Sequence, residues 1–398
     1  MIKKYFVTRS LKNRLEKTFK AGGIYITHKS GDRTHYITPK IHAADLLKNP
    51  NRLQYVFTVP LGLDPKEVIK KEWLFMQQYG ENIELKQDNK RFTLTIYVEK
   101  MATDNKYIFE VVSDHIEGLK LPIYCGKDVN NQHIAYDMVS NPHLLIAGES
   151  GGGKSTQVRQ VLTTLIKTIS PYNLHFYLAD MKRSEFHLFR RVEHVKKVCT
   201  RVSELMTVLT KLKKETEKRG DLLDKYEVTH IDDLPKEKRL PYIILCIDEV
   251  ALLKKEKEAM EIIEDISAIG RALGMFLILS MQRPDAKVLD GKLKVNLTVR
   301  MGFRSADLIN SRIIGTPGAE KISINERGRF FLKLEQLREL QAPFLKDDKA
   351  KALLEPYKVE VQEERVEDNV QDNAQETPVN EPQQEEITFG VIEYEAER

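Results

Sequence analysis

His143-Leu-Leu-Ile-Ala-Gly-Glu-Ser-Gly-Gly-Gly-Lys-Ser-Thr156 joins a short apolar run to a glycine-rich turn. The apolar residues 144–147 predict a buried strand, and the turn matches the template Gly148-x-x-x-x-Gly153-Lys154-Ser155 at every fixed position. Apolar residues then recur at spacings of three and four from Val158 to Ile169, which predicts a helix. Strand, turn and helix in this order predict a phosphate-binding P-loop.

The residue types of this turn are those that bind a nucleoside triphosphate. Backbone N–H groups of the glycines and of the helix N-terminus point at phosphates, a lysine neutralises their charge, and a serine hydroxyl ligates Mg²⁺. We therefore predict ATP and Mg²⁺ as cofactors, with a chance glycine-rich turn as the alternative. The residues assigned to ATP binding are Gly148, Glu149, Ser150, Gly151, Gly152, Gly153, Lys154, Ser155 and Thr156.

A second apolar run, Tyr242 to Ile247, ends in two carboxylates and predicts a central parallel strand buried on both faces. Ligands of such sheets collect at the carboxyl ends of the strands, so Asp248 is expected to hold Mg²⁺ together with Ser155. Glu249 is then free to orient or activate the attacking water. The alternative is a strand that ends in a solvated acidic turn. Lys154 of the P-loop lies 94 residues before Asp248, and its presence favours a catalytic pair over a solvated turn.

Length and cysteine content limit the class of protein. The chain of 398 residues is long enough for two or three domains of ~150 residues. No apolar stretch approaches the ~18–20 residues that cross a bilayer, and the charged N-terminus does not fit a secretory signal. Cys125, Cys199 and Cys246 are too scattered for a disulfide framework or a metal cluster. We expect a cytoplasmic protein without an integral membrane segment.

The net charge of +4 is unevenly distributed. Residues 359–398 hold 13 acidic and two basic residues, a net charge of −11, so residues 1–358 carry +15. A body this basic favours a polyanionic partner such as nucleic acid, although many lysine-rich proteins are simply well solvated. The acidic tail has the composition of a disordered segment. Its more apolar end, residues 387–395, is either a partner-docking peptide or a featureless terminus.

The chain is expected to have four segments: residues 1–50, a small module with some β structure and no readable role; 51–122, a small α/β domain; 123–350, the P-loop domain; and 351–398, the acidic tail. The P-loop segment alternates strands with helices, which predicts an α/β fold with a parallel sheet covered on both faces. Its predicted strands are 143–147, 174–179, 242–247, 275–280 and 297–303, and its predicted helices are 154–169, 203–227 and 256–273.

Several further motifs, in order, resemble the motor domain of the FtsK/SpoIIIE DNA translocases over roughly residues 50–335. The resemblance implies a RecA-like P-loop fold preceded by a smaller α/β domain. The segments that carry it, besides the P-loop, are Tyr55 to Pro65, Gly126 to Asp128, Tyr177 to Lys182, Leu240 to Glu249, Arg271 to Pro284, Lys294 to Arg300, Ser311 to Ile314 and Gly318 to Lys321.

The resemblance also implies roles for residues beyond the P-loop. Gln282, at the end of a predicted strand, is expected to contact the γ-phosphate and the attacking water, or else to be an exposed turn residue. An arginine supplied to the γ-phosphate, often by a neighbouring subunit, is expected of a ring motor. The candidates are Arg283, Arg300 and Arg312, and the sequence does not rank them. For each of them the alternative is an arginine that forms a structural ion pair or faces DNA. The residues expected to grip DNA phosphates are Lys321, Arg327 and Arg329.

The sequence departs from the family pattern in three ways: it has no membrane anchor, no winged-helix module, and Glu326 and Arg329 where the family usually has glycine and aspartate. We therefore expect a soluble, single-motor double-stranded DNA translocase, a homo-hexameric ring that moves DNA in transfer or segregation of a mobile element, plasmid or phage. A recruiting protein is expected to bind the tail or the N-terminal module. Two alternatives remain: a protein-secretion ATPase of the same motor family, and an ATP-gated DNA-binding adaptor.

Overall fold

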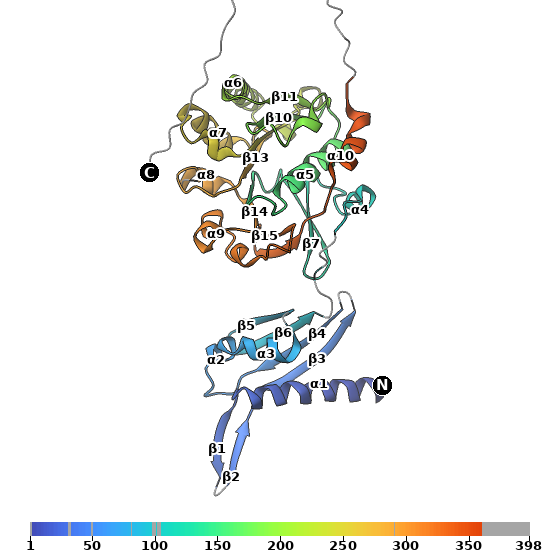
Figure 1. Cartoon of the computed structure of the whole chain (residues 1–398), viewed down its shortest axis with the longest axis vertical. Helices are drawn as coiled ribbons and strands as arrows, with labels where there is room; N and C mark the ends of the chain where they lie inside the picture. Colours follow the sequence, from blue (N-terminus) through green and yellow to red (C-terminus); the bar gives the residue numbers. More distant parts are fainter. Residues whose placement is uncertain are drawn as a thin grey trace, which may run out of the picture. The chain divides into compact units, whose positions relative to one another are not determined.

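The computed structural model describes residues 2–30, 33–48, 51–80, 82–97, 101, 105–289 and 291–359. Within these residues the chain forms a small N-terminal domain, residues 2–97, and a larger domain, residues 105–359, each with its own hydrophobic core (Figure 1). The predicted disordered tail lies, from residue 360 onward, outside the described residues. None of the described helices is long and apolar enough to span a membrane.

The small domain is a four-stranded antiparallel sheet in the order β3-β4-β6-β5, with an additional hairpin of β1 and β2. Helices pack on the sheet through Phe19 and Phe75, whose rings contact each other and Phe57 of the sheet. Its elements are α1 (Ile2–Ala21), β1 (Ile26–Ser30), β2 (Arg33–Ile37), β3 (Lys40–Lys48), β4 (Asn51–Thr58), α2 (Pro65–Lys70), α3 (Glu72–Tyr79), β5 (Ile83–Asp88) and β6 (Arg91–Tyr97).

The predicted division at residue 50 differs from the structure. Leu15 and Phe19 of α1 share one core with Leu53 and Tyr55 of β4, and β3 pairs with β4 along its length. Residues 2–97 are therefore one folding unit rather than two modules. Leu11, Leu15 and Phe19 recur every four residues, so a helical period was present in the sequence and was overlooked.

The larger domain is built on a ten-stranded sheet in the order β11-β10-β12-β13-β9-β14-β15-β16-β7-β8. The first six strands are parallel and the last four are antiparallel to their neighbours. Its strands are β7 (Pro122–Asp128), β8 (His133–Asp137), β9 (Leu144–Ala147), β10 (Leu174–Asp180), β11 (Val195–Cys199), β12 (Tyr242–Asp248), β13 (Met275–Met281), β14 (Val299–Phe303), β15 (Arg329–Lys333) and β16 (Leu337–Gln341).

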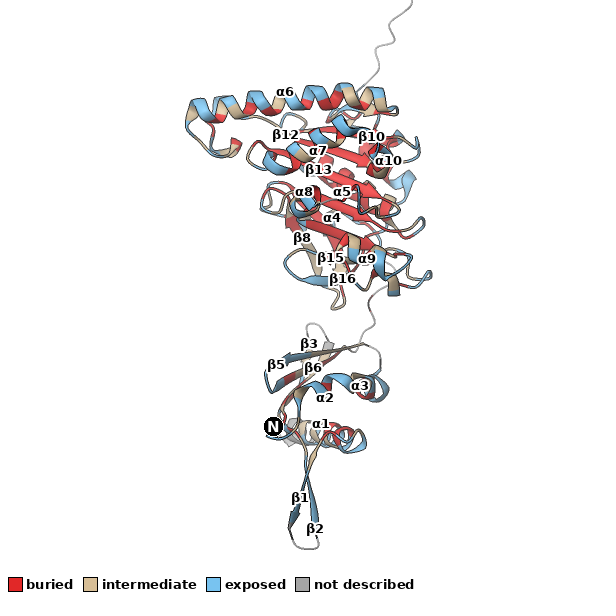
Figure 2. Ribbon diagram, turned by 90° about the vertical axis from the view of Figure 1, so that its left-hand side faces the viewer, coloured by how far each residue is buried: buried red, intermediate tan, exposed pale blue. Residues whose placement is uncertain are grey.

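Helices cover both faces of this sheet, because its central strands are apolar on both sides. Leu144 and Ile146 of β9 face a core shared with α5, whereas Leu145 and Ala147 face a core shared with α6 and α7. Figure 2 shows buried residues throughout these strands, and α6 with one buried and one exposed side. The helices are α4 (Phe109–Asp114), α5 (Lys154–Thr168), α6 (Val202–Tyr226), α7 (Lys257–Ile269), α8 (Gly291–Asn296), α9 (Leu308–Ile314) and α10 (Asp347–Leu354).

This architecture confirms the predicted α/β class with a mostly parallel sheet, and the strands predicted at 143–147, 174–179, 242–247 and 275–280 are those observed. The domain is longer at both ends than predicted. Tyr107 and Leu121 belong to the core around α5, so the domain begins near 105 rather than at 123. Leu354 of α10 is fully buried in the same core, so residues 351–359 belong to this domain and not to the tail.

Candidate active site

The P-loop connects β9 to α5. At two of its glycines, neighbouring residues lie so close that there is no space for a side chain. Gly148 has φ +142°, and a Cβ atom there would lie 2.7 Å from Cβ of Phe303. Gly153 has φ +117°, and its Cβ atom would lie 2.9 Å from Cα of Gly328. Only glycine adopts these conformations without strain and leaves this space. The glycines therefore allow the loop backbone to pack closely against Phe303 and Gly328.

The N-terminus of α5 has the features of a phosphate site. Its first N–H groups have no partner within the helix, and no side chain caps it at Gly153. Lys154 is only 6% exposed, and burial lowers the pKa of its amine, opposed by the negative charges of Asp248 and Glu249. A buried lysine and uncapped N–H groups at one point suit a polyphosphate, so the residues present fit ATP.

Asp248 lies at the carboxyl end of β12, where its carboxyl group suits a Mg²⁺ ion. Burial raises the pKa of this carboxyl to about 6, helped by the charge of Glu185 and opposed by Lys182 and Lys154. Mg²⁺ is commonly held by one or two carboxylates together with phosphate oxygens and water. Asp248 and Ser155 provide oxygen ligands of this type, so the donor set fits the predicted ion.

Glu249 is a buried carboxylate that is held by donors from two neighbouring segments. It is 6% exposed and has the left-handed backbone conformation, with φ +64°, that is uncommon for a non-glycine residue. Its carboxylate accepts hydrogen bonds from Nζ of Lys182 at 2.7 Å and from the backbone N–H of Gln282 at 3.1 Å. The ends of β10, β12 and β13 are thereby joined through one side chain.

Gln282 and Arg283 lie next to the P-loop. A cavity of about 260 Å³ separates the turn after β13 from the loop and is lined by Gly148, Glu149, Gln282, Arg283, Pro284, Ser305, Ala306 and Asn310. The backbone of Gln282 is fixed by Glu249, whereas its half-buried side chain borders the cavity. An amide and a guanidinium therefore border this cavity together with the P-loop.

Sequence reasoning missed three side chains at this edge. Lys182 binds Glu249, Arg304 forms an ion pair with Glu149 at 2.6 Å, and Glu185 accepts a hydrogen bond from the Ser155 hydroxyl at 2.6 Å. Lys182 and Glu185 follow the strand β10, which is paired in parallel with β12. Because the carboxyl ends of parallel strands lie at one edge, the residues after every strand of this set were candidates.

The candidate arginines fall into two groups. Arg300 is 9% exposed, and its guanidinium donates to the carbonyls of Leu297 at 3.0 Å, Ile314 at 3.3 Å and Lys294. Because these hydrogen bonds engage the guanidinium inside the domain, Arg300 links α8 and α9 to the sheet and is not free to contact a γ-phosphate. Arg283 and Arg312 are exposed and remain candidates.

The predicted DNA-contacting residues are also divided. Lys321 and Arg327 are exposed, but Arg329 is 8% exposed and donates to Glu339 at 2.9 Å and to Gln341 at 3.1 Å. Glu326, the other departure from the family pattern, lies 3.7 Å from the same guanidinium. Arg329 therefore stabilises the turn instead of presenting its charge to a ligand.

This turn also contacts the P-loop directly. The backbone N–H of Gly328 donates to the carbonyl of Gly152 at 2.9 Å, and the carbonyl of Gly328 accepts from the N–H of Ala342 at 2.8 Å. The exposed residues Lys321 and Arg327 therefore lie in the segment that precedes Gly328, and Gly328 contacts the nucleotide-binding loop.

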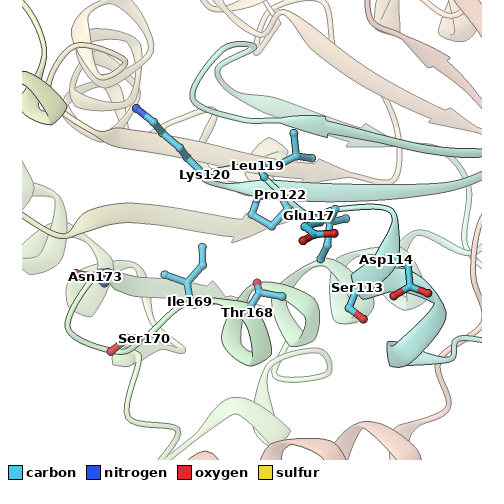
Figure 3. Close-up of a pocket in the computed structure, with 12 residues that line it drawn as sticks. Ser113, Asp114, Glu117, Leu119, Lys120, Pro122, Thr168, Ile169, Ser170 and Asn173 are labelled. Atoms are coloured by element: carbon cyan, nitrogen blue, oxygen red, sulfur yellow. The ribbon is translucent and has the colours of Figure 1, made fainter.

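A larger cavity, of about 670 Å³, lies at the other end of α5 and contains none of the predicted site residues. It is formed by the segment around Glu117 and Lys120 and by the turn from Thr168 to Asn173 that precedes β10 (Figure 3). Lys120 there is bound to Asp232 at 2.5 Å. Cavity size alone therefore does not mark the site of this domain.

Comparison with known proteins agrees with this geometry. Residues 106–286 match the FtsK/SpoIIIE family. DNA translocase FtsK of Borreliella burgdorferi is 33% identical over 252 residues, which is 60% of this chain and 32% of the relative. DNA translocase FtsK of Helicobacter pylori strain J99 is 32% identical over 257 residues, 61% of this chain and 30% of the relative. The match thus covers about a third of the length of these relatives.

Solved structures share the fold. The pCW3 conjugation coupling protein TcpA, a monomer form with ATPγS, superposes with a TM-score of 0.60 and 24% identity over 87% of this chain and 99% of that chain. EssC (ATPases 2 and 3) from Geobacillus thermodenitrificans gives a TM-score of 0.58 and 20% identity over 65% of this chain and 52% of that chain. The resemblance predicted from the motifs is confirmed for residues 106–286, which match the FtsK/SpoIIIE family, and the chain shares the fold of these solved structures.

Proposed function

We propose that this protein is an ATP-dependent double-stranded DNA translocase that acts as a homo-hexameric ring. The observation that carries the proposal is the hydrogen bond between Gly328 and Gly152, because it links the turn that follows Lys321 and Arg327 to the phosphate-binding loop. A motor needs such a link, since movement of its DNA-contacting segment must depend on the state of the nucleotide. The names of the FtsK relatives support DNA as the substrate.

The residues at the carboxyl edge divide the chemistry among them. Lys154 and the N–H groups at the start of α5 hold the phosphates, and Ser155 and Asp248 hold Mg²⁺, which supplies charge neutralisation for phosphoryl transfer. Glu249, oriented by Lys182, accepts the proton of the attacking water. Gln282 orients that water, and Arg283 or Arg312 delivers positive charge to the γ-phosphate, from the same or a neighbouring subunit.

The proposal extends to DNA of a mobile element, plasmid or phage. Its support is the structural likeness to a conjugation coupling protein along almost the whole of that chain. The basic residues 1–358 carry +15, which favours non-specific binding to phosphates. We place a recruiting partner on the acidic C-terminal segment or the N-terminal domain.

Strand displacement separates this function from an ATP-gated adaptor or a secretion-type ATPase. The protein, ATP and a linear duplex that carries a short triplex-forming strand are mixed, and release of that strand is measured. A translocase releases it in an ATP-dependent way, whereas ATP hydrolysis without release supports the adaptor. The Lys154→Ala variant is the matched control for ATP-independent release.

Ring formation is tested separately by light scattering of the Glu249→Gln variant with ATP and duplex DNA. A species near six chains is expected, because trapped ATP keeps the arginine of one subunit on the phosphate of the next. A protein that stays monomeric under these conditions while the wild type translocates would contradict the ring.

A further inference from the structure

We infer that Glu185 is a positioning residue for the magnesium ligand Ser155. It holds the proton of the Ser155 hydroxyl and so directs the lone pairs of that oxygen toward the metal. The inference deepens the proposed nucleotide site and rests on it. Glu185 lies outside the P-loop, after the neighbouring strand β10, and no motif in the sequence drew attention to it.

The hydrogen bond itself is short and charge-assisted. Oγ of Ser155 donates to Oε1 of Glu185 at 2.6 Å, within the range of strong O–H···O⁻ bonds. A serine hydroxyl has one proton and two lone pairs. With its proton committed to Glu185, the oxygen of Ser155 can face a cation only through its lone pairs, which is the orientation a metal ligand needs.

Backbone contacts fix the position of Glu185. The buried carboxylate of Asp180, 2% exposed, accepts the N–H groups of Ser184, Glu185 and Phe186, each at 3.0 Å. Phe186 is 1% exposed in the core beneath α5. The turn after β10 is therefore anchored on both sides of Glu185, so the carboxylate is held at the P-loop by the fold.

The arrangement also separates the roles of two carboxylates. Because Ser155 has a single proton, its bond to Glu185 excludes donation to Asp248. Both oxygens of Asp248 would therefore be available to the metal or its water shell, whereas Glu185 would act on the metal only through Ser155. Removal of Glu185 should therefore weaken Mg²⁺ binding without removing a direct ligand.

The test is binding of a fluorescent ATP analogue to the full-length protein, first in EDTA and then as a function of Mg²⁺ concentration. For Glu185→Ala we expect a Mg²⁺ midpoint about tenfold higher than for the wild type, equivalent to ~1.4 kcal/mol. Binding in EDTA should be unchanged. Glu217→Ala, on the exposed side of α6, is the matched control and should behave as the wild type.

A double-mutant cycle with Ser155→Ala tests whether Glu185 changes the Mg²⁺ midpoint through Ser155. If Glu185 acts through Ser155, Glu185→Ala should add nothing to the shift that Ser155→Ala causes. Glu185→Gln keeps the side-chain shape and should raise the Mg²⁺ midpoint by less than Glu185→Ala. It replaces the alanine variant in the test if that variant does not fold.

Two results would overturn the inference alone: Mg²⁺ midpoints within twofold of the wild type for both Glu185 variants, or fully additive shifts in the cycle. A wild-type protein that binds no ATP analogue, with or without Mg²⁺, would instead overturn the proposed function, and this inference with it.

Discussion

The two edges of the parallel half of the sheet are made by the same strands and yet carry different chemistry. At the carboxyl edge, Lys154, Asp248 and Glu249 are buried or half-buried, and their charges interact across three strands. At the amino edge, the cavity of Figure 3 is larger, but its Lys120 is largely exposed and bound to Asp232. Desolvated charge beside uncapped helix N–H groups, rather than cavity volume, therefore distinguishes the proposed active site.

The largest expected effect is the difference in ATP turnover between variants of two lysines, one at each edge. Lys154→Ala should lower ATP turnover to the background level, a greater loss than in any other variant, because the amine acts on phosphate charge inside the fold. Lys120→Ala, at the amino edge, should keep wild-type turnover. Turnover is measured as phosphate release, and circular dichroism checks that both variants are folded. Wild-type turnover in Lys154→Ala would remove the distinction between the edges.

The next effect separates catalysis from binding within the carboxyl edge. Glu249→Gln should lower turnover by roughly 10²–10⁴-fold, the usual contribution of a general base, while ATP stays bound. Binding of a fluorescent ATP analogue and single-turnover hydrolysis give the two quantities. Glu117→Gln in the amino-edge cavity is the matched control. If Glu249→Gln lost affinity as strongly as turnover, the role of Glu249 would be structural.

The next prediction compares the stability of two variants, one at the buried Arg300 and one at the exposed Arg312. Arg300→Met should lower the free energy of unfolding by about 3 kcal/mol, because it leaves buried carbonyls without a donor. Arg312→Ala should change stability by less than about 0.5 kcal/mol, as is usual for exposed positions. Urea denaturation of both variants measures the difference. Equal stability of the two would show that the carbonyl contacts of Arg300 do not hold α8 and α9 in place.

The smallest effect at neutral pH concerns His143, 1% exposed at the amino edge. Its Nδ1 accepts the N–H of Leu277, and burial lowers the pKa of the imidazole to about 4. Because its unfolded pKa is about 6.5, the unfolded state binds the proton first as the pH falls. Stability should decline between pH ~6.5 and ~4, by roughly 3 kcal/mol from this residue.

His143→Asn removes this titration and suits the positive φ of the position. The unfolding free energy of the wild type should therefore depend more steeply on pH than that of His143→Asn. Parallel pH profiles for the two proteins would contradict a neutral His143 in the folded state.

Within the parallel half of the large domain, β9, β10, β12 and β13 were predictable because they are short apolar runs followed by glycine, acid or amide residues. The edge strand β11 was missed, because Val195-Lys-Lys-Val-Cys199 mixes charged and apolar residues. The antiparallel half was missed, because β15 and β16 mix charged and apolar residues, as in Leu337-Arg-Glu-Leu-Gln341. The P-loop and the Asp248–Glu249 pair follow from local spacing. The contact of Glu185 with Ser155 joins residues 30 positions apart, and the burial of Arg300 and Arg329 depends on tertiary packing, so neither could be predicted from spacing alone.

The most direct test of the central claim, that this nucleotide site drives work on DNA, is the ATP turnover of the full-length protein with and without linear duplex DNA. The measurement belongs at ~50 mM salt, where phosphate contacts are weakly screened, and again at higher salt. Turnover should rise when duplex DNA is added, the rise should shrink as salt increases, and Lys154→Ala should show no rise. The same turnover with and without DNA at low salt would contradict it.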